Sequence, residues 1–241
     1  MTGSRWTRRD VLLTGAALGS MPLAGMADER RMISRPIPSS GEPLPVIGLG
    51  TYSVCDVDST PGQIATRREI VDLLVGAGGS VIDTSPMYNR SEKIIGDIIA
   101  SGAPRDPMFI ATKVWTDGRD AGIEQMALSA RLMNTDVIDL MQVHNLRDTA
   151  VHMRGIRELQ EQGKIRYSGL THYRASAHDA LEQEMREYRP QFLQINYSLG
   201  EREADQRLLP AAKDLGVGVI INRPYQAGGL FRAVRGRDLP G

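Results

Sequence analysis

Short apolar runs alternate with longer amphipathic segments through most of the chain, beginning near residue 46. The runs have the length of strands, and the segments between them repeat apolar residues at helical spacing. This alternation is typical of βα units and predicts a parallel sheet. We predict strands at 46–49, 80–82, 108–112, 137–143, 166–170, 192–196 and 217–221. We predict helices at 63–77, 122–134, 151–163 and 176–188.

Turn and cap residues support two of these helices. Asp148 and Thr149 are both candidates for the N-cap of the helix at 151–163, and Gly163 suits its C-terminal end. Pro190 ends the helix at 176–188. The boundaries therefore agree with the periodicity.

The order of elements predicts an α/β fold, a (β/α)8 TIM barrel of which only seven βα strands are present. Such barrels close with eight strands and about 250 residues, whereas this chain ends soon after the seventh predicted strand. We expect a C-terminally truncated barrel with unpaired edges on its first and seventh strands. An incomplete sequence and a natural truncation both account for this, and the ending at 237–241, which has no terminal helix, favours the first.

Four side chains with proton-transfer chemistry follow the ends of three successive predicted strands. Asp83 and Tyr88 follow the strand at 80–82, Lys113 follows the next strand, and His144 follows the strand at 137–143. The carboxyl ends of all strands of a parallel barrel open on one face, so these residues can converge there. The sequence thus predicts a site that contains an acid, a phenol, an amine and an imidazole.

The four residue types complement one another chemically. A tyrosine has an ordinary pKa of about 10, and a nearby ammonium such as that of Lys113 lowers it. A lysine beside an apolar pocket tends to lose its proton, so Asp83 is needed to keep it charged. His144 would orient a carbonyl oxygen or relay a proton. Tyr88 could then protonate a carbonyl oxygen while a nicotinamide cofactor delivers hydride to the carbon.

Each residue taken singly also has a structural interpretation. Asp83 could cap the following turn, and Tyr88 could be a half-buried packing residue. Lys113 could extend its stem along the surface, and His144 could be a core histidine bonded to backbone. The four together, in this order and spacing, favour the catalytic interpretation.

At these motifs the chain resembles the aldo-keto reductase family, over residues from about 47 to 229. The resemblance rests on Gly-Leu-Gly-Thr at 48–51, Ile-Asp-Thr-Ser-Pro-Met-Tyr at 82–88, Ala-Thr-Lys-Val at 111–114 and Asp-Leu-Met-Gln-Val-His at 139–144. It implies that Tyr88 is the general acid, that Lys113 lowers its pKa, that Asp83 supports the lysine and that His144 orients the substrate. It also implies a small-molecule carbonyl substrate (an aldehyde, a ketone or a sugar), with NADP as cofactor and NAD as the alternative.

The resemblance further implies a set of cofactor contacts. Thr171, His172 and Gln194 would hold the nicotinamide carboxamide, although His172 stands where the family commonly has asparagine. A histidine cannot copy the donor and acceptor that an amide offers in one plane. Asn222 stands where the family usually has a tyrosine that stacks on the nicotinamide. The implied cofactor-binding residues are Gly50, Thr51, Thr171, His172, Gln194, Asn222, Arg223 and Gly228.

The amino-terminal residues have the pattern of a twin-arginine signal peptide, which we assign to residues 1–27. Arg8 and Arg9 precede an apolar stretch at 11–19, and Gly25 and Ala27 occupy plausible cleavage positions. The stretch is shorter than the roughly 20 residues that span a bilayer, so we expect no stable membrane span. We expect the Tat translocase to export the protein to the periplasm; if the signal is not used, the protein is cytoplasmic. We assign 28–45 to a linker and 46–241 to the barrel.

Composition narrows the function classes further. The formal net charge is +0 and the pI is about 6.9, which argues against a nucleic-acid partner. Cys55 is the only cysteine and is expected to be a loop thiol, so no intramolecular disulfide can form.

Two other functions remain as alternatives. One is a catalytically weak nicotinamide-binding barrel with a sensing or partner-docking role, motivated by His172, Asn222 and the missing unit. The other is a metal-dependent hydrolase that uses Asp83, His144 and His172. For a substrate pocket, we expect walls that include Tyr52, Trp115 and the loop near Met87, and hence apolar contacts.

Overall fold

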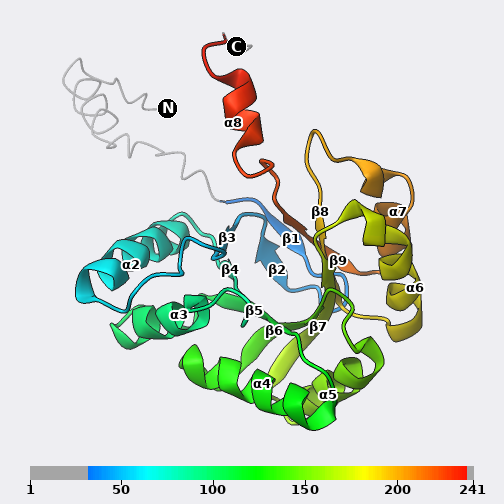
Figure 1. Ribbon diagram of the computed structural model, residues 1–241, viewed down its shortest axis with the longest axis horizontal. Helices are drawn as coiled ribbons and strands as arrows, with labels where there is room; N and C mark the ends of the chain where they lie inside the picture. Colours follow the sequence, from blue (N-terminus) through cyan, green and yellow to red (C-terminus); the bar gives the residue numbers. More distant parts are fainter. Residues whose placement is uncertain (1–31, 238–241) are drawn as a thin grey trace, which may run out of the picture. The chain divides into compact units, whose positions relative to one another are not determined.

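Seven parallel strands form one sheet in the computed structural model, which describes residues 32–237 (Figure 1). The signal peptide expected at 1–27 lies outside the described residues. The strands are β3 (Gly48–Gly50), β4 (Val81–Asp83), β5 (Phe109–Val114), β6 (Ile138–His144), β7 (Ile165–His172), β8 (Phe192–Asn196) and β9 (Gly218–Asn222). All seven predicted strands are therefore confirmed, with ends that differ by at most two residues.

The strands follow one another in the sheet in chain order, and every neighbouring pair is parallel. The curled sheet with helices outside it is a TIM barrel of seven βα strands (Figure 1). Within residues 32–237 no eighth parallel strand joins β3 to β9. These two edge strands instead border a common cavity, described below.

Helices cover the outside of the sheet (Figure 1). They are α2 (Pro61–Gly76), α3 (Ser91–Ala100), α4 (Arg119–Leu132), α5 (Thr149–Glu161), α6 (His178–Tyr188) and α7 (Leu208–Asp214). A further helix, α8 (Gly229–Val234), follows β9 and extends away from the sheet (Figure 1). The four predicted helices correspond to α2, α4, α5 and α6. Helices α3 and α7 were not predicted because they have only 10 and 7 residues, too few for a clear helical period.

The ends of α5 show which cap interpretation is right. Asp148 occupies the N-cap position but makes no side-chain capping hydrogen bond. Its Oδ2 instead accepts the backbone N–H of Gly118 at 2.8 Å, from the loop before α4. Gly163 follows the helix with φ of 69°, in the left-handed region that favours glycine. The predicted helix end at Gly163 is confirmed. Asp148 takes the N-cap position, but its carboxylate connects two loops and does not cap the helix.

Apolar side chains form two layers, one on each face of the curled sheet. The larger layer packs between the strands and the helices, and Cys55 belongs to it. Cys55 is thus buried, and burial raises the pKa of its thiol. The inner layer consists of Ile37, Val81, Phe109, Ala111, Leu140, Tyr167 and Phe192. Alternation of side chains along each strand separates the two layers.

The segment 28–45, expected to be a linker, contains a β-hairpin within the described part. Strands β1 (Ser34–Pro36) and β2 (Pro43–Pro45) pair antiparallel. Ile37, between them, is 2% exposed and packs in the inner layer. The hairpin was missed because four prolines lie between 36 and 45, and proline inside a run argues against a strand. The folded unit therefore begins before residue 46.

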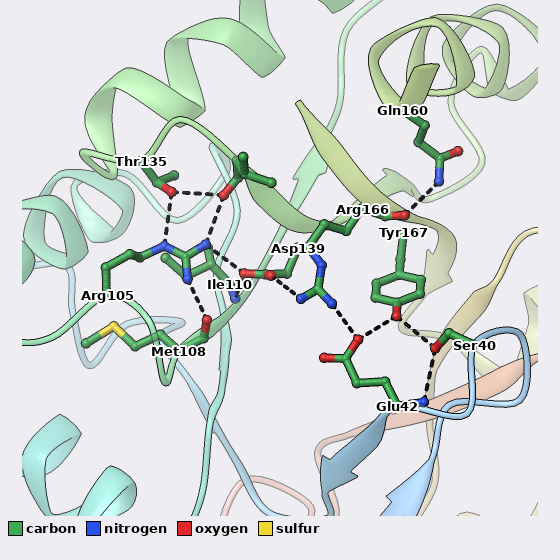
Figure 2. Close-up of polar contacts among 11 residues, drawn as sticks. Ser40, Glu42, Arg105, Met108, Ile110, Thr135, Asp139, Gln160, Arg166 and Tyr167 are labelled. Carbon is green, nitrogen blue, oxygen red and sulfur yellow. Dashed lines mark hydrogen bonds and ion pairs between the residues drawn. The ribbon is translucent and has the colours of Figure 1, made fainter. Parts of the chain in front are cut away.

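A polar network joins this hairpin to β6 and β7 (Figure 2). Asp139 accepts hydrogen bonds from Arg105 and Arg166, both at 2.7 Å, and from the N–H of Ile110 at 2.9 Å. Arg166 also pairs with Glu42 of the hairpin, whose Oε2 lies 2.7 Å from the Tyr167 hydroxyl. The hairpin is thus fixed by charged hydrogen bonds as well as by apolar packing.

None of the helices within residues 32–237 has both the length and the apolar character needed to cross a membrane.

Candidate active site

The site begins with a buried ion pair between adjacent strands. Asp83 ends β4, and Lys113 is the fifth residue of β5. The Lys113 Nζ lies 2.9 Å from each carboxylate oxygen of Asp83 and 2.8 Å from the backbone oxygen of Thr84. Lys113 is 1% exposed. Its three ammonium protons therefore have three acceptors, which is the arrangement that a buried charge requires.

Tyr88 lies over this pair. The Lys113 Nζ is 5.1 Å from the centre of the tyrosine ring. Burial raises the pKa of the Tyr88 phenol, the ammonium of Lys113 opposes this rise, and the carboxylate of Asp83 adds to it. We expected a lowered pKa; Lys113 does act in that direction, but burial is the larger effect and the paired Asp83 offsets part of the lysine charge. The phenol therefore carries its proton at neutral pH.

His144 closes the cluster at the end of β6. Its ring lies 6.5 Å from that of Tyr88, at an interplanar angle of 89°. Burial, the charge of Lys113 and the neighbouring His172 lower the pKa of His144 to about 4. The imidazole is therefore neutral at physiological pH, with one nitrogen a donor and the other an acceptor. Ser85 Oγ lies 3.4 Å from its Nδ1 and accepts the N–H of Met87 at 3.2 Å.

One cavity of about 1060 Å³ brings most of the predicted site residues together. Besides the four residues above, those that line it are Gly50, Thr51, Thr171, Gln194, Asn222 and Arg223. Tyr52, Met87 and Trp115, expected as apolar walls, line it as well, and so does Tyr173, which was not expected. The cavity extends between the edges of β3 and β9, and its volume slightly exceeds the roughly 300–1,000 Å³ of ordinary small-molecule sites.

Two predicted residues, His172 and Gly228, do not line this cavity. The Nδ1 of His172 accepts the backbone N–H of Arg174 at 3.1 Å, and the ring stacks on Tyr173 with 5.5 Å between centres. The side chain is held by its own turn, and Tyr173 faces the cavity instead. Gly228, with φ of 83°, precedes α8.

Two of the predicted residues, Gln194 and Asn222, can hold a nicotinamide carboxamide. The Thr171 hydroxyl donates to Gln194 Oε1 at 3.0 Å, which leaves the Gln194 amide N–H groups as donors. The Oδ1 of Asn222 is buried and has no hydrogen-bond partner within the described structure. A carboxamide offers one oxygen acceptor and one NH₂ donor, so Gln194 and Asn222 together supply the complementary pair.

Sequence reasoning missed one residue that supports the ion pair. Gln142, on β6, is fully buried, and its Nε2 lies 3.4 Å from Asp83 Oδ1. It precedes His144 by two positions, so both side chains project from the same face of the strand. The spacing of two residues between Gln142 and His144 could have indicated from the sequence that Gln142 faces the site.

The metal-site alternative finds no support in this geometry. Both oxygens of Asp83 bind the ammonium of Lys113, which occupies the position a cation would take. Among residues 32–237 no group of three or more His, Cys, Asp or Glu side chains could hold a metal ion.

Comparisons with known proteins agree with this geometry. The sequence pattern of the Aldo/keto reductase family matches residues 46–240. The chain is 31% identical over 194 residues to the aldo-keto reductase YhdN of Bacillus subtilis, covering 73% of this chain and 56% of that protein. It is 29% identical over 196 residues to the methylglyoxal reductase YeaE of Escherichia coli, covering 78% of this chain and 67% of that protein. This chain thus spans little more than half the length of YhdN.

Solved structures show the same fold. The holo form of aldo-keto reductase AKR11C1 from Bacillus halodurans matches with a TM-score of 0.71 and 24% identity, over 87% of this chain and 71% of that one. An aldo/keto reductase from Klebsiella pneumoniae, in complex with NADP and acetate, matches with a TM-score of 0.68 and 25% identity, over 80% and 69%. From the family pattern, the first curated relative and this shared fold, the chain belongs to the aldo/keto reductase family.

Proposed function

We propose that this protein is a nicotinamide-dependent reductase that converts the carbonyl group of an aldehyde, a ketone or a sugar to an alcohol. The observation that carries the proposal is the cluster of the buried Lys113 with the half-buried Asp83 and Tyr88, which opens on one cavity with His144. Membership of the family and the reductase names of the two curated relatives support it.

Tyr88 is the proton donor in this proposal. Its phenol is protonated at neutral pH, since the ordinary pKa of tyrosine is about 10 and burial raises the pKa of Tyr88; it can therefore give a proton to the carbonyl oxygen as the carbon receives hydride. The nearby ammonium of Lys113 stabilises the phenolate that remains, and Asp83 keeps this ammonium paired between turnovers. Solvent then returns a proton to Tyr88.

His144 orients the substrate. Because its pKa is about 4, it acts as a neutral hydrogen-bond donor to the carbonyl oxygen and not as an acid. Ser85 is placed to bond Nδ1, which would leave the proton on Nε2, toward the substrate.

NADP is the proposed cofactor, with NAD as the alternative, and it supplies the hydride when bound. Gln194 and Asn222 would hold the carboxamide, and Arg223 would add positive charge near the phosphates. Gly50 and Thr51 border the same cavity. Related structures from Klebsiella pneumoniae and Bombyx mori were solved with NADP, which favours that cofactor.

The replacement Tyr88→Phe tests the reductase proposal. It removes only the hydroxyl, so we expect kcat for NADPH-dependent aldehyde reduction to fall about 10²-fold to 10⁴-fold, the usual contribution of general acid catalysis. NADPH binding, measured by fluorescence titration, should stay within a factor of two or so of the wild type. Tyr225→Phe is the matched control, because Tyr225 lines the same cavity at its exposed edge.

If the wild type and Tyr88→Phe consume NADPH equally slowly while both bind it, the reductase proposal is wrong. A nicotinamide-binding barrel with a sensing or docking role then becomes the better account.

Export is a separate proposal that rests on Arg8 and Arg9. We propose a periplasmic location reached through the Tat translocase. Replacing both arginines by lysine should retain the protein in the cytoplasm, as fractionation would show; unchanged export would contradict the proposal.

A further inference from the structure

Two loops meet at the mouth of the cavity through a stacked pair of side chains. Trp115 directly follows β5 and lines the cavity. Arg147 belongs to the loop between β6 and α5, and its guanidinium carbon lies 4.6 Å from the centre of the Trp115 ring. A guanidinium at this distance is attracted to the face of an indole. Arg147 therefore covers one face of the ring of a residue that lines the cavity.

The guanidinium of Arg147 is itself fixed by a two-point contact. Its Nε donates to Asp117 Oδ1 at 2.8 Å, and its Nη2 donates to Asp117 Oδ2. Such fork-shaped pairs set orientation as well as distance. The same guanidinium holds the pKa of Asp117 below its ordinary value. Asp117 lies two residues after Trp115, so Arg147 contacts the Trp115 loop twice.

Neighbouring elements fix the backbone of the same loop. The Trp115 N–H donates to Gln125 Oε1 at 2.6 Å, from α4. The Thr116 carbonyl oxygen lies 2.8 Å from His152 Nε2, on α5. The N–H of Gly118 donates to Asp148 Oδ2. The loop is thus held from both flanking helices and from the loop that carries Arg147.

The Arg147 loop has an unusual backbone. Asn145, Leu146 and Asp148 have φ of 55°, 57° and 50°. L-residues disfavour this left-handed region, least so for asparagine and aspartate, and a leucine there is uncommon. Strained backbone persists where surrounding contacts determine it, and it is enriched at functional sites. These residues lie on both sides of Arg147 in the chain. The loop therefore adopts a disfavoured backbone conformation where it places Arg147 against Trp115.

We propose that Arg147 is a positioning residue for substrate specificity, because it holds Trp115 as a fixed aromatic wall of the cavity. This inference rests on the proposed reductase function. Tyr52, Met87 and Tyr173 also line the mouth and are at least 39% exposed. A fixed indole among such side chains favours a planar or apolar group next to the carbonyl. A small aldehyde gains little from the wall.

Tryptophan fluorescence gives a test that does not depend on turnover. The chain has two tryptophans, Trp6 and Trp115, so Trp6→Phe leaves Trp115 as the only emitter. In Arg147→Leu we expect a shifted Trp115 emission and stronger acrylamide quenching. Arg147→Lys keeps the charge but not the fork and should give an intermediate change. Arg119→Leu is the control, since Arg119 is also paired with carboxylates and lies over no aromatic ring among residues 32–237.

Kinetics test the consequence for specificity. In Arg147→Leu, KM for benzaldehyde should rise about tenfold, which corresponds to about 1.4 kcal/mol. The values of kcat for benzaldehyde and of KM for propanal should stay within roughly twofold, because chemistry and the carbonyl site are untouched. A benzaldehyde-to-propanal KM ratio equal to that of the wild type would overturn the proposal, and so would unchanged Trp115 fluorescence.

If the wild type reduces neither aldehyde, the proposed function fails separately. Quenching of Trp115 by benzaldehyde then measures binding directly. Weaker binding in Arg147→Leu than in Arg119→Leu would support the assignment of Arg147, and equal binding would overturn it.

Discussion

Replacing Asp139 by asparagine removes the central charge of the network that joins the hairpin to the barrel (Figure 2). The carboxylate accepts three hydrogen bonds, from Arg105, Arg166 and the N–H of Ile110, and its side chain is 6% exposed. Asparagine has the same shape but offers one acceptor oxygen, and its NH₂ group would face guanidinium donors. At least one arginine then loses its hydrogen bond to residue 139.

The size of the effect follows from the exposure of the two arginines. Breaking a buried pair by removing one partner costs about 3–5 kcal/mol, because the remaining charge stays out of water. The side chains of Arg105 and Arg166 are 23% and 40% exposed, so water can partly solvate each of them. Arg166 also retains Glu42. We therefore expect the free energy of unfolding to fall by about 3 kcal/mol, the lower end of this range. Such a loss lowers Tm by about 6–12 °C in a domain of this size.

Urea denaturation followed by circular dichroism measures the change in the free energy of unfolding. Asp120→Asn is the matched control: Asp120 also pairs with an arginine, but its side chain is 99% exposed, so we expect a change within about 0.5 kcal/mol. If Asp139→Asn changes the free energy of unfolding by no more than Asp120→Asn does, the network does not stabilise the hairpin and this reasoning is refuted.

The remaining predictions concern pH and backbone contact. The pKa of His144 is lowered to about 4 in the folded state, whereas the ordinary value of about 6.5 applies in the unfolded chain. Between pH 6.5 and 4 the unfolded chain therefore binds more protons than the folded one. The stability that neutral His144 contributes, up to about 3 kcal/mol, is fully present above pH 6.5 and is lost as the pH falls to 4. Urea titrations at several pH values should show a smaller loss in His144→Gln, and equal losses would contradict the lowered pKa. Gly96→Ala should destabilise α3 by more than 1 kcal/mol despite the higher helix propensity of alanine, because its Cβ would lie 1.9 Å from the backbone oxygen of Leu132. Gly62→Ala, which has open space around it, should be neutral or slightly stabilising; equal Tm values for the two variants would show that the close approach relaxes freely.

The sequence was most informative where a feature depends on residues close together in the chain. The strand at 192–196 was predicted with its observed limits, and Gly163 marked the end of α5. Asp83, Lys113 and His144 could be placed because strand ends in a parallel barrel share one face. Local sequence was sufficient for these features, since a strand buried on both faces is a short continuous apolar run bounded by turn residues.

The sequence failed where local rules conflict with tertiary packing. The prolines around the hairpin argue against strands, yet Ile37 packs inside the barrel and Glu42 pairs with Arg166, 124 positions away. Asp148 was an N-cap candidate by residue type, but its carboxylate binds the backbone of Gly118 instead.

The site shows the same division. The sequence by itself determined the order of the chemical groups, Asp83, Tyr88, Lys113 and His144, and the strand after which each one comes. The tertiary structure decided that His172 bonds its own turn while Tyr173 and Asn222 face the cavity. It also decided that burial outweighs Lys113 in setting the pKa of Tyr88. These outcomes depend on distances, burial and competing partners among segments far apart in sequence, which no local pattern of residues encodes.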